Sequence, residues 1–431
     1  MNKYKNLLVT LAAAWLAICT PLAALTPEPA ASESQKVALV GGTIHTVKNG
    51  DIENGVLTFA NGKITGIHRS RDIDLSGYQQ IDITGQHVYP GLIMPDSVLG
   101  LVEVDALRHT TDFRERGSLN PSVRTLTSYN TDSELIPTMR FNGILVAQVA
   151  PVGGLVSGTS SIVQLDAWNW EDAAIKTDDG VHINWPNPSY YKYDSNTDTV
   201  NLTENENYSE NRQQLEQLFL DSAKSTKNNN LKLNAMQGVF DGSQTLFLSA
   251  DRPQAIIEAV RFLKQVGVQR VVLKSNSAAL LATDILRQHN IPVLVNSLHN
   301  VPSQDHHDVD TVYRLPQELV AQGLKVGISN NDWLMSSRNL AFHAGSAAAY
   351  GMPKNDALRM ITLSNAEILG IDDRLGSLEV GKDATLFVSS GDALDMRSQQ
   401  LSHIWIAGRA VQRDAMQQEL HQRFKDRYSG Q

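Results

Sequence analysis

The feature that most constrains the fold of this sequence is an alternation of short apolar segments with longer amphipathic ones between residues 141 and 369. Strands are expected at residues 141–149, 271–273, 291–296 and 325–329. Helices are expected at residues 253–266, 278–289, 316–322 and 355–369. The first of these helices has apolar residues at helical spacing, namely Ile256, Ile257, Val260, Leu263 and Val266. Short strands that alternate with helices predict a parallel β/α architecture.

Both ends of the expected mature chain have a different sequence pattern, one of short strands and tight turns. Residues 37–40, 43–47, 54–59, 63–68 and 80–89 read as short strands joined by Gly and Asn turns, the first of them at Gly41-Gly42. Residues 385–388 and 402–407 have the same character near the C-terminus. We therefore expect β-structure before and after the β/α region.

The first residues predict export. Two lysines precede the apolar, Ala-rich residues 7–24, and a polar, Pro-containing segment follows. We expect a signal peptide at residues 1–24, a linker at 25–36 and a periplasmic mature protein without a membrane span. Cys19 is the single cysteine, so no disulfide or thiolate metal site is expected after cleavage. A faint lipoprotein pattern before Cys19 leaves lipidation open.

The charge balance excludes one class of partner. The formal net charge is −9, whereas binding to a nucleic-acid backbone requires a basic face. Small-molecule ligands remain compatible with this charge, because a local pocket can differ from the global balance.

Several motifs resemble the amidohydrolase superfamily, and in particular its imidazolonepropionase-like branch. They are Tyr89 to Leu101, Gly153 to Gly158, Arg338 to Gly345, Tyr350 to Pro353, Ala357 to Gly370 and the sequence GSLEVGKDA from Gly376 to Ala384. The resemblance implies a (β/α)8 TIM-type barrel with a small β-sandwich domain built from both termini. It divides the chain into sandwich halves at 37–90 and 376–415, a barrel at 91–375 and a C-terminal tail at 416–431.

The resemblance also implies a metal site, which can be checked position by position. In the family, one or two divalent metals activate a water at the C-terminal face of the barrel, and an Asp accepts its proton. The expected ligand positions are occupied here by Asp96, Val98, Ser249, Lys274 or Ser275, and Asn331. Because Val98 has no donor atom and Asn331 cannot act as a base, we expect the binuclear centre to be lost. A shift of one residue would instead align Asp332 as the base.

Lys274 is the most informative remaining residue at the expected site. It could be a carbamylated metal bridge, a Schiff-base nucleophile, or an ion-pair partner for Asp96 or Asp332. We expect the ion pair, because a cation would neutralise carboxylates left without metal. Glu103, Asp112 and Arg338 could line the same pocket.

Two further segments carry open alternatives. Asp305-His306-His307-Asp308, with His299 and Asp310 nearby, is either a relocated metal site or a solvated loop. His343 and His109 are expected to be structural. Residues 185–210 are polar and without periodicity, so we expect a long loop that is either a lid, a partner contact or a surface excursion.

These observations lead to three functional hypotheses. The favoured one is a non-catalytic or regulatory subunit, as a homo-oligomer or beside a related amidohydrolase. The second is an active amidohydrolase with an atypical or mononuclear site for zinc or another divalent metal, acting on amide or cyclic amide substrates. The third is a binding protein that keeps a small-molecule pocket without chemistry.

Overall fold

The fold is taken from a computed structural model that describes residues 28–31, 35–69, 72–195, 197–225, 229–296, 298–302, 308–329, 334–413 and 415–429. Several predictions fall outside these residues. They are the signal peptide with Cys19, part of the linker, the Asp305 to His307 part of the histidine cluster, and the candidate residues Asn331 and Asp332.

Eight strands form a sheet that curls into a nearly closed barrel. The strands are β6 (Leu92–Ser97), β7 (Ile144–Val149), β8 (Val156–Gln164), β9 (Ala174–Asn184), β12 (Thr245–Ser249), β13 (Val271–Ser275), β14 (Val293–Asn296) and β15 (Val326–Ser329), hydrogen-bonded in that order. All neighbours are parallel except β8, which runs antiparallel to β7 and β9. The predicted α/β barrel is confirmed, with one reversed strand.

The reversal at β8 follows from the short connection that precedes it. A parallel connection needs a crossover of a dozen residues or more. Only residues 150–155 join β7 to β8, and they include Pro151 and two glycines, Gly153 and Gly154, with positive φ. Such a turn returns the chain beside β7 in the opposite direction.

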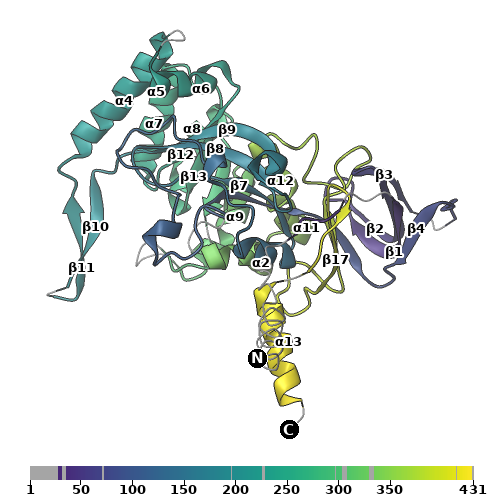
Figure 1. Ribbon diagram of the computed structural model, residues 1–431. Helices are drawn as coiled ribbons and strands as arrows, with labels where there is room; N and C mark the ends of the chain where they lie inside the picture. The colour runs from purple at the N-terminus through teal and green to yellow at the C-terminus, as the bar shows by residue number, and fades with distance from the viewer. Residues whose placement is uncertain are drawn as a thin grey trace, which may run out of the picture.

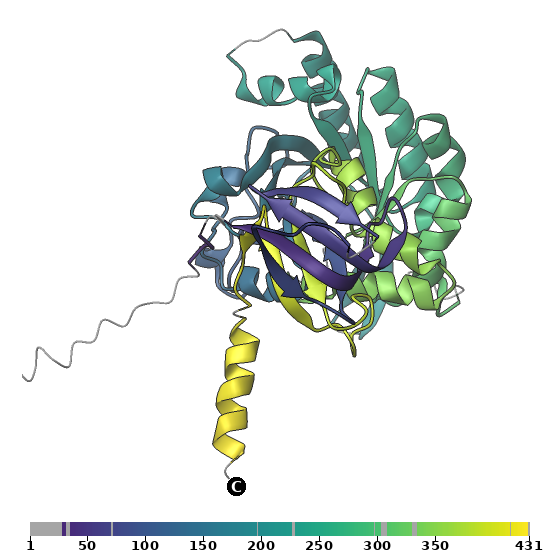
Figure 2. The same cartoon turned by 90° about the vertical axis from the view of Figure 1, so that its right-hand side faces the viewer.

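Helices surround the barrel, as Figures 1 and 2 show. They are α2 (Leu135–Phe141), α3 (Trp170–Ala173), α4 (Tyr208–Lys224), α5 (Leu231–Ala235), α6 (Gln237–Asp241), α7 (Pro253–Gln265), α8 (Thr283–Gln288), α9 (Thr311–Ala321), α10 (Leu340–Ala349), α11 (Lys354–Met360) and α12 (Leu363–Leu369). Short 3-10 turns are η1 (Arg108–Thr110), η2 (Leu126–Ser128), η3 (Ser277–Ala282) and η4 (Leu334–Asn339). Among the described helices, none has the length and apolar character needed to cross a bilayer.

Three predicted helices differ in detail. The segment 278–289 begins as the 3-10 turn η3 before α8, and α9 begins at Thr311, so that Pro316 lies inside the helix and not at its start. The segment 355–369 is divided into α11 and α12. At the break, the carbonyl of Ile361 accepts a hydrogen bond from Ile93 N in β6 at 2.9 Å, which ties the chain to the barrel.

The two ends of the chain meet in a second sheet, packed beside the barrel in Figure 1. Its strands are β1 (Lys36–His45), β2 (Asp51–Ala60), β3 (Lys63–His68), β4 (Tyr78–Asp82), β5 (His87–Pro90), β16 (Leu386–Ser389), β17 (Leu401–Ile406) and β18 (Arg409–Ala410). Antiparallel pairing of β5 with β16 joins the N-terminal and C-terminal strands. The strands expected at both ends therefore share one hydrogen-bonded sheet.

The segment predicted to be a long loop has regular structure. Within 185–210, β10 (Ser189–Asp194) and β11 (Thr199–Glu204) form an antiparallel hairpin, and α4 starts at Tyr208, so the prediction of a long loop is wrong. Tyr, Val and Thr favour strands even on a surface without a core face, which is why no periodicity marked them. The tail contains α13 (Met416–Tyr428), which extends away from the body in both views.

The barrel is closed at its seam by one side chain. β6 and β15 are the two ends of the hydrogen-bonded strand order. Asn365, in α12 and fully buried, donates from Nδ2 to the carbonyls of Ile93 in β6 and Ile328 in β15, both at 2.9 Å. Gly327 leaves room for this amide, because a Cβ at that position would lie 2.1 Å from Asn365 Oδ1.

Replacing the seam amide should destabilise the barrel. Asn365→Ala leaves two buried carbonyls without their donor, which predicts a loss of about 2–4 kcal/mol in the free energy of unfolding. Denaturant unfolding measures this loss. The exposed Asn355→Ala in α11 is the control, with an expected change within about 0.5 kcal/mol. Equal effects of the two variants would contradict the role given to Asn365.

Candidate functional site

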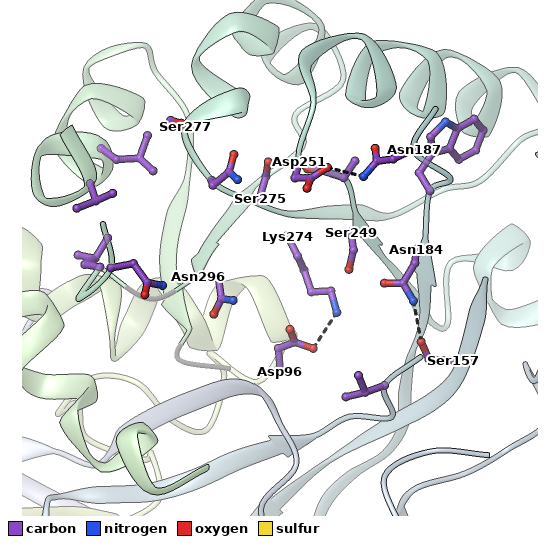
Figure 3. Close-up of a pocket in the computed structure, with 18 of the residues that line it drawn as sticks. Asp96, Ser157, Asn184, Asn187, Ser249, Asp251, Lys274, Ser275, Ser277 and Asn296 are labelled. Carbon is purple, nitrogen blue, oxygen red and sulfur yellow. Dashed lines mark hydrogen bonds and ion pairs between the residues drawn. The ribbon is translucent and has the colours of Figure 1, made fainter. Parts of the chain in front are cut away.

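The floor of the barrel mouth is an ion pair between strands on opposite sides of the barrel. Lys274, in β13, places its Nζ 2.8 Å from Oδ1 of Asp96, in β6. Both side chains are largely buried, at 13% and 7% exposed. The ion pair expected from the sequence is therefore present with Asp96, as Figure 3 shows.

A β-bulge in β6 places the carboxylate at this position. The pairing of β6 with β7 shifts by one residue between Met94 and Ser97, so the extra residue distorts the strand there. Asp96 lies in this distortion with φ of +55°, a left-handed conformation that Asp tolerates better than most residues. Its backbone N donates to Gln148 Oε1 at 3.0 Å. Val98, two residues later, packs against the hydrophobic core.

A third residue at this floor, His182 in β9, was not identified from the sequence. Its Nδ1 lies 3.2 Å from Lys274 Nζ and 3.4 Å from Asp96 Oδ1. The signal that could have found it is the alternation Val181, His182, Ile183, Asn184, which predicts one polar strand face. Its ring is stacked on Phe247 of β12, with centroids 4.6 Å apart.

Beneath these three residues lies a buried hydrogen-bonded network. His182 Nε2 is 2.9 Å from Ser160 Oγ, and that hydroxyl donates to Asp179 Oδ1 at 2.7 Å. Gln148 Nε2 donates to Asp179 Oδ2 at 2.7 Å and to Ser160 Oγ at 3.2 Å. Gln148 also accepts a hydrogen bond from Asp96 N, so the network connects back to the residue that pairs with Lys274. Each of these polar side chains is almost completely buried and hydrogen-bonded.

The donors of this network determine the protonation of His182. The Ser160 hydroxyl has one hydrogen, which it gives to Asp179, so His182 Nε2 must carry the proton in its bond to Ser160. In the neutral ring, Nδ1 is then the acceptor, and the Lys274 ammonium donates to it. Burial and the neighbouring charge of Lys274 lower the pKa of His182 to about 4, which agrees with a neutral ring.

The two carboxylates have opposite shifts. Burial alone would raise the pKa of Asp96, but the charge of Lys274 and the contact with His182 hold it below its usual value. Burial raises the pKa of Asp179 to about 6, and hydrogen bonds from Ser160 and Gln148 only partly oppose this effect. At neutral pH the floor thus contains one ammonium, two carboxylates and a neutral imidazole.

The donor atoms at the barrel mouth do not fit a catalytic zinc site. Such a site needs three or more imidazole, carboxylate or thiolate ligands around one point. Within the described ranges, no group of three His, Cys, Asp or Glu side chains is arranged in this way. Among the described residues, Asp96 and His182 are the strong donors at the floor, and the Lys274 ammonium contacts both. The Asp251 carboxylate also lines the cavity, where it accepts a hydrogen bond from Asn187. Ser249 offers only a hydroxyl, and Ser275 donates its hydroxyl to the carbonyl of Ala250 at 2.7 Å.

Above this floor is a polar cavity of about 520 Å³. The strand register places Asn184, Ser249 and Lys274 side by side on β9, β12 and β13. Figure 3 shows side chains around the cavity, and its polar part consists largely of amides and hydroxyls: Ser157, Asn184, Asn187, Ser249, Ser275, Ser277 and Asn296. Apolar residues, among them Trp185, Leu298 and Leu315, complete the lining. Asn187 donates to Asp251 at 2.8 Å. This lining both donates and accepts hydrogen bonds, and it suits a polar ligand.

Several residues predicted to line the pocket lie elsewhere. Glu103 accepts from Asn130 at 3.1 Å, Asp112 is exposed, and Arg338 lies in η4. None of the three is among the described residues that line the cavity. Asp96, Ser249, Lys274 and Ser275 do come together there.

The histidines near the predicted relocated metal site contact each other and not a cavity. His299 and His343 stack with ring centroids 4.0 Å apart, and His343 Nδ1 accepts from Leu298 N at 2.9 Å. Burial lowers the pKa of His343 to about 3. These contacts give His343 a structural role, as expected. His306 and His307 lie outside the described residues.

Comparisons with solved structures agree on the barrel. An amidohydrolase from Thermotoga maritima MSB8 is 21% identical, with a TM-score of 0.75, and the match covers 88% of this chain and 100% of that one. An adenosine deaminase from Xanthomonas campestris with bound zinc is 15% identical with a TM-score of 0.52, over 93% of this chain and 99% of that one. At these identities the likeness concerns the fold.

Comparisons of sequence point to the same group of proteins. The amidohydrolase tasK of Hapsidospora irregularis is 29% identical over 92 residues, which are 21% of this chain and 9% of that protein. The chain thus spans a small part of that relative's length. Residues 264–411 match the model of the Amidohydrolase family. The match covers about a third of the chain, and it lies within a molecule whose fold is similar to that of the solved amidohydrolase.

Proposed function

We propose that this chain is a non-hydrolytic, metal-independent member of the family that binds a small polar ligand at the barrel mouth. The observation that carries the proposal is the Lys274 ammonium, which contacts both strong donors of the site. In this proposal Lys274 supplies the positive charge that a metal supplies in a hydrolase. Its role is to hold Asp96 and His182 in place beneath the ligand.

The chemistry of amide hydrolysis supports this proposal. A hydrolase must lower the pKa of a water and then accept its proton. His182 is neutral and its free nitrogen faces Lys274, while the Asp96 carboxylate is compensated by the same ammonium. Neither group is therefore placed to activate a water in the cavity above.

The lining of the cavity supports a role in ligand binding, because its polar groups are ordered and not merely left over from a catalytic site. Its amide and hydroxyl side chains are held in fixed positions, as where Asn184 donates to Gly154 O at 2.8 Å and to Ser157 Oγ at 3.2 Å. Fixed groups that donate and accept recognise a neutral polar molecule, such as an amide or a polyhydroxylated compound. We further propose an imidazolonepropionase-like ancestry, export to the periplasm, and a regulatory role beside a related hydrolase or a second copy.

The alternative is an active enzyme with a mononuclear site, and it has one observation in its favour. Asp96 Oδ1 and His182 Nδ1 are 3.4 Å apart and converge on one point. If Lys274 moved away, these two atoms and a third ligand could hold a divalent metal. The two readings therefore differ in whether a metal displaces Lys274.

Zinc should leave the wild-type protein unchanged. A metal that binds only the folded state raises the unfolding temperature. We expect neither an excess of zinc nor a chelator to shift the thermal transition, and we expect no zinc-dependent hydrolysis of amide or cyclic amide substrates. Stabilisation by zinc together with chelator-sensitive hydrolysis would establish the mononuclear enzyme and refute the proposal.

Removing the ammonium should leave a buried charge. Lys274→Ala is expected to cost about 3–5 kcal/mol in the free energy of unfolding, because the Asp96 carboxylate loses its partner. Asp96→Ala in the same chain should recover much of that loss. The exposed pair Lys354 and Asp392, 2.6 Å apart, is the control, and Lys354→Ala should cost no more than about 1 kcal/mol. If the double variant loses as much stability as the two single variants together, Lys274 and Asp96 are not coupled.

Two residues of the buried network should make the stability of the protein depend on pH in opposite directions. The folded-state pKa of His182, about 4, lies below its usual 6.5, so its contribution to stability is present above pH 6.5 and is lost as the pH falls toward 4. The pKa of Asp179, about 6, lies above its usual 3.8, so its contribution is full below pH 3.8 and is lost as the pH rises through 6.

Single variants at His182 and Asp179 should reveal how each residue changes the pH dependence of stability. Between pH 6.5 and pH 4, the destabilisation by His182→Gln relative to wild type should shrink by on the order of 3 kcal/mol. The destabilisation by Asp179→Asn should instead grow by a similar amount. Urea unfolding across this pH range measures both differences. Parallel slopes for the two variants would contradict the assigned protonation states.

A further inference from the structure

The hairpin of β10 and β11 stands out from the body of the molecule beside the barrel mouth, as Figure 1 shows. The two strands form a sheet of their own, so each has an outer edge without a further strand in the described part of the chain. An isolated two-stranded hairpin is at best marginally stable in water. Its side chains therefore indicate what could stabilise it.

One face of this hairpin is apolar. In the strand register, Tyr191 is opposite Leu202 and Tyr193 is opposite Val200. Residues directly opposite, and residues two apart along a strand, lie on the same face. All four side chains are between 59% and 63% exposed. They form a continuous apolar face that is more than half exposed, although Tyr191 and Leu202 also line a hollow next to Leu280 and Leu281.

The two outer edges of the hairpin differ in charge. β10 carries Lys192 and Asp194, and charged residues on an edge strand oppose pairing with another chain. Residues 199–203 of β11 are Thr, Val, Asn, Leu and Thr, which include no charge, proline or glycine. β11 therefore has the edge on which a further strand can add.

We propose that β11 pairs with β11 of a second copy of this chain, antiparallel and centred on Asn201. This inference does not depend on the proposed function. In this register Asn201 is opposite its own equivalent, Val200 is opposite Leu202, and Thr199 is opposite Thr203. Each strand contributes five uncharged residues, with Asn201 on the two-fold axis and two residue pairs on either side of it, as a symmetric interface requires.

The register also joins the apolar faces. Val200 and Leu202 lie on the same face as Tyr191 and Tyr193, so pairing at Asn201 places the faces of both hairpins side by side. The result is a four-stranded sheet with eight apolar side chains on one face. Shifting the centre by half a residue would place apolar side chains of one copy opposite polar ones of the other, because neighbours along a strand alternate between faces. The acidic residues Asp198 and Glu204 flank the paired segment and limit its extension.

Cysteine cross-linking tests the register directly. In a Cys19→Ser background, Asn201→Cys places two thiols opposite each other across the two-fold axis, within the range in which disulfides form. We expect Asn201→Cys to give a reducible covalent dimer on mild oxidation. Thr203→Cys alone should not cross-link, whereas Thr199→Cys with Thr203→Cys should. Failure of Asn201→Cys to cross-link better than Thr203→Cys would overturn the proposal.

Sedimentation of the unmodified chain tests the apolar face. Val200→Lys with Leu202→Lys should raise the dimer dissociation constant by at least about tenfold. Lys192→Glu, on the other strand and the opposite face, is the matched control and should leave the dimer unchanged. Thermal unfolding checks that all variants keep the fold. A wild-type monomer at tens of micromolar, or dimers that are indifferent to the β11 substitutions, would refute the interface.

Discussion

The contact of the Lys274 ammonium with Asp96 and His182 is the interaction on which the interior of this barrel depends. It joins β13, β6 and β9, three strands that are distant in sequence, at one point beneath the cavity. Without it, a carboxylate would lie buried and uncompensated, which is far more costly than an exposed charge. The contact also agrees with the network beneath it, in which Ser160 donates to Asp179 and His182 Nδ1 is left as an acceptor for Lys274.

In the proposed function, the same contact lets a barrel similar to that of the amidohydrolases persist without the usual metal ligands. A metal site holds several electronegative side chains together by its positive charge. An ammonium can do the same for two donors, and the remaining positions can then become serine and valine, as at Ser249 and Val98. The mouth keeps its shape because strand ends, not ligands, form its walls. What changes is the ability to activate water, and this change is the basis of the proposed binding role.

Part of the fold and of the candidate site could be predicted from the sequence. Hydrophobic periodicity predicted α7 and the strands β13 to β15. The resemblance to amidohydrolase motifs placed Lys274 at the barrel mouth, where an ion pair with Asp96 or Asp332 was expected. His182 was missed because β9 follows a reversed strand, and no periodic signal had placed residues 156–184 in the barrel. Its partners Gln148, Ser160 and Asp179 come together only through the strand register. The hairpin was missed because its pattern of aromatic and polar residues has no core to pack against.

The most direct test of the central claim is anomalous scattering at the zinc edge from crystals of this chain grown with excess zinc. The account predicts no anomalous peak at the barrel mouth and Lys274 Nζ within hydrogen-bonding distance of both Asp96 and His182. A strong peak bonded to Asp96 and His182, with the Lys274 side chain displaced from them, would contradict it.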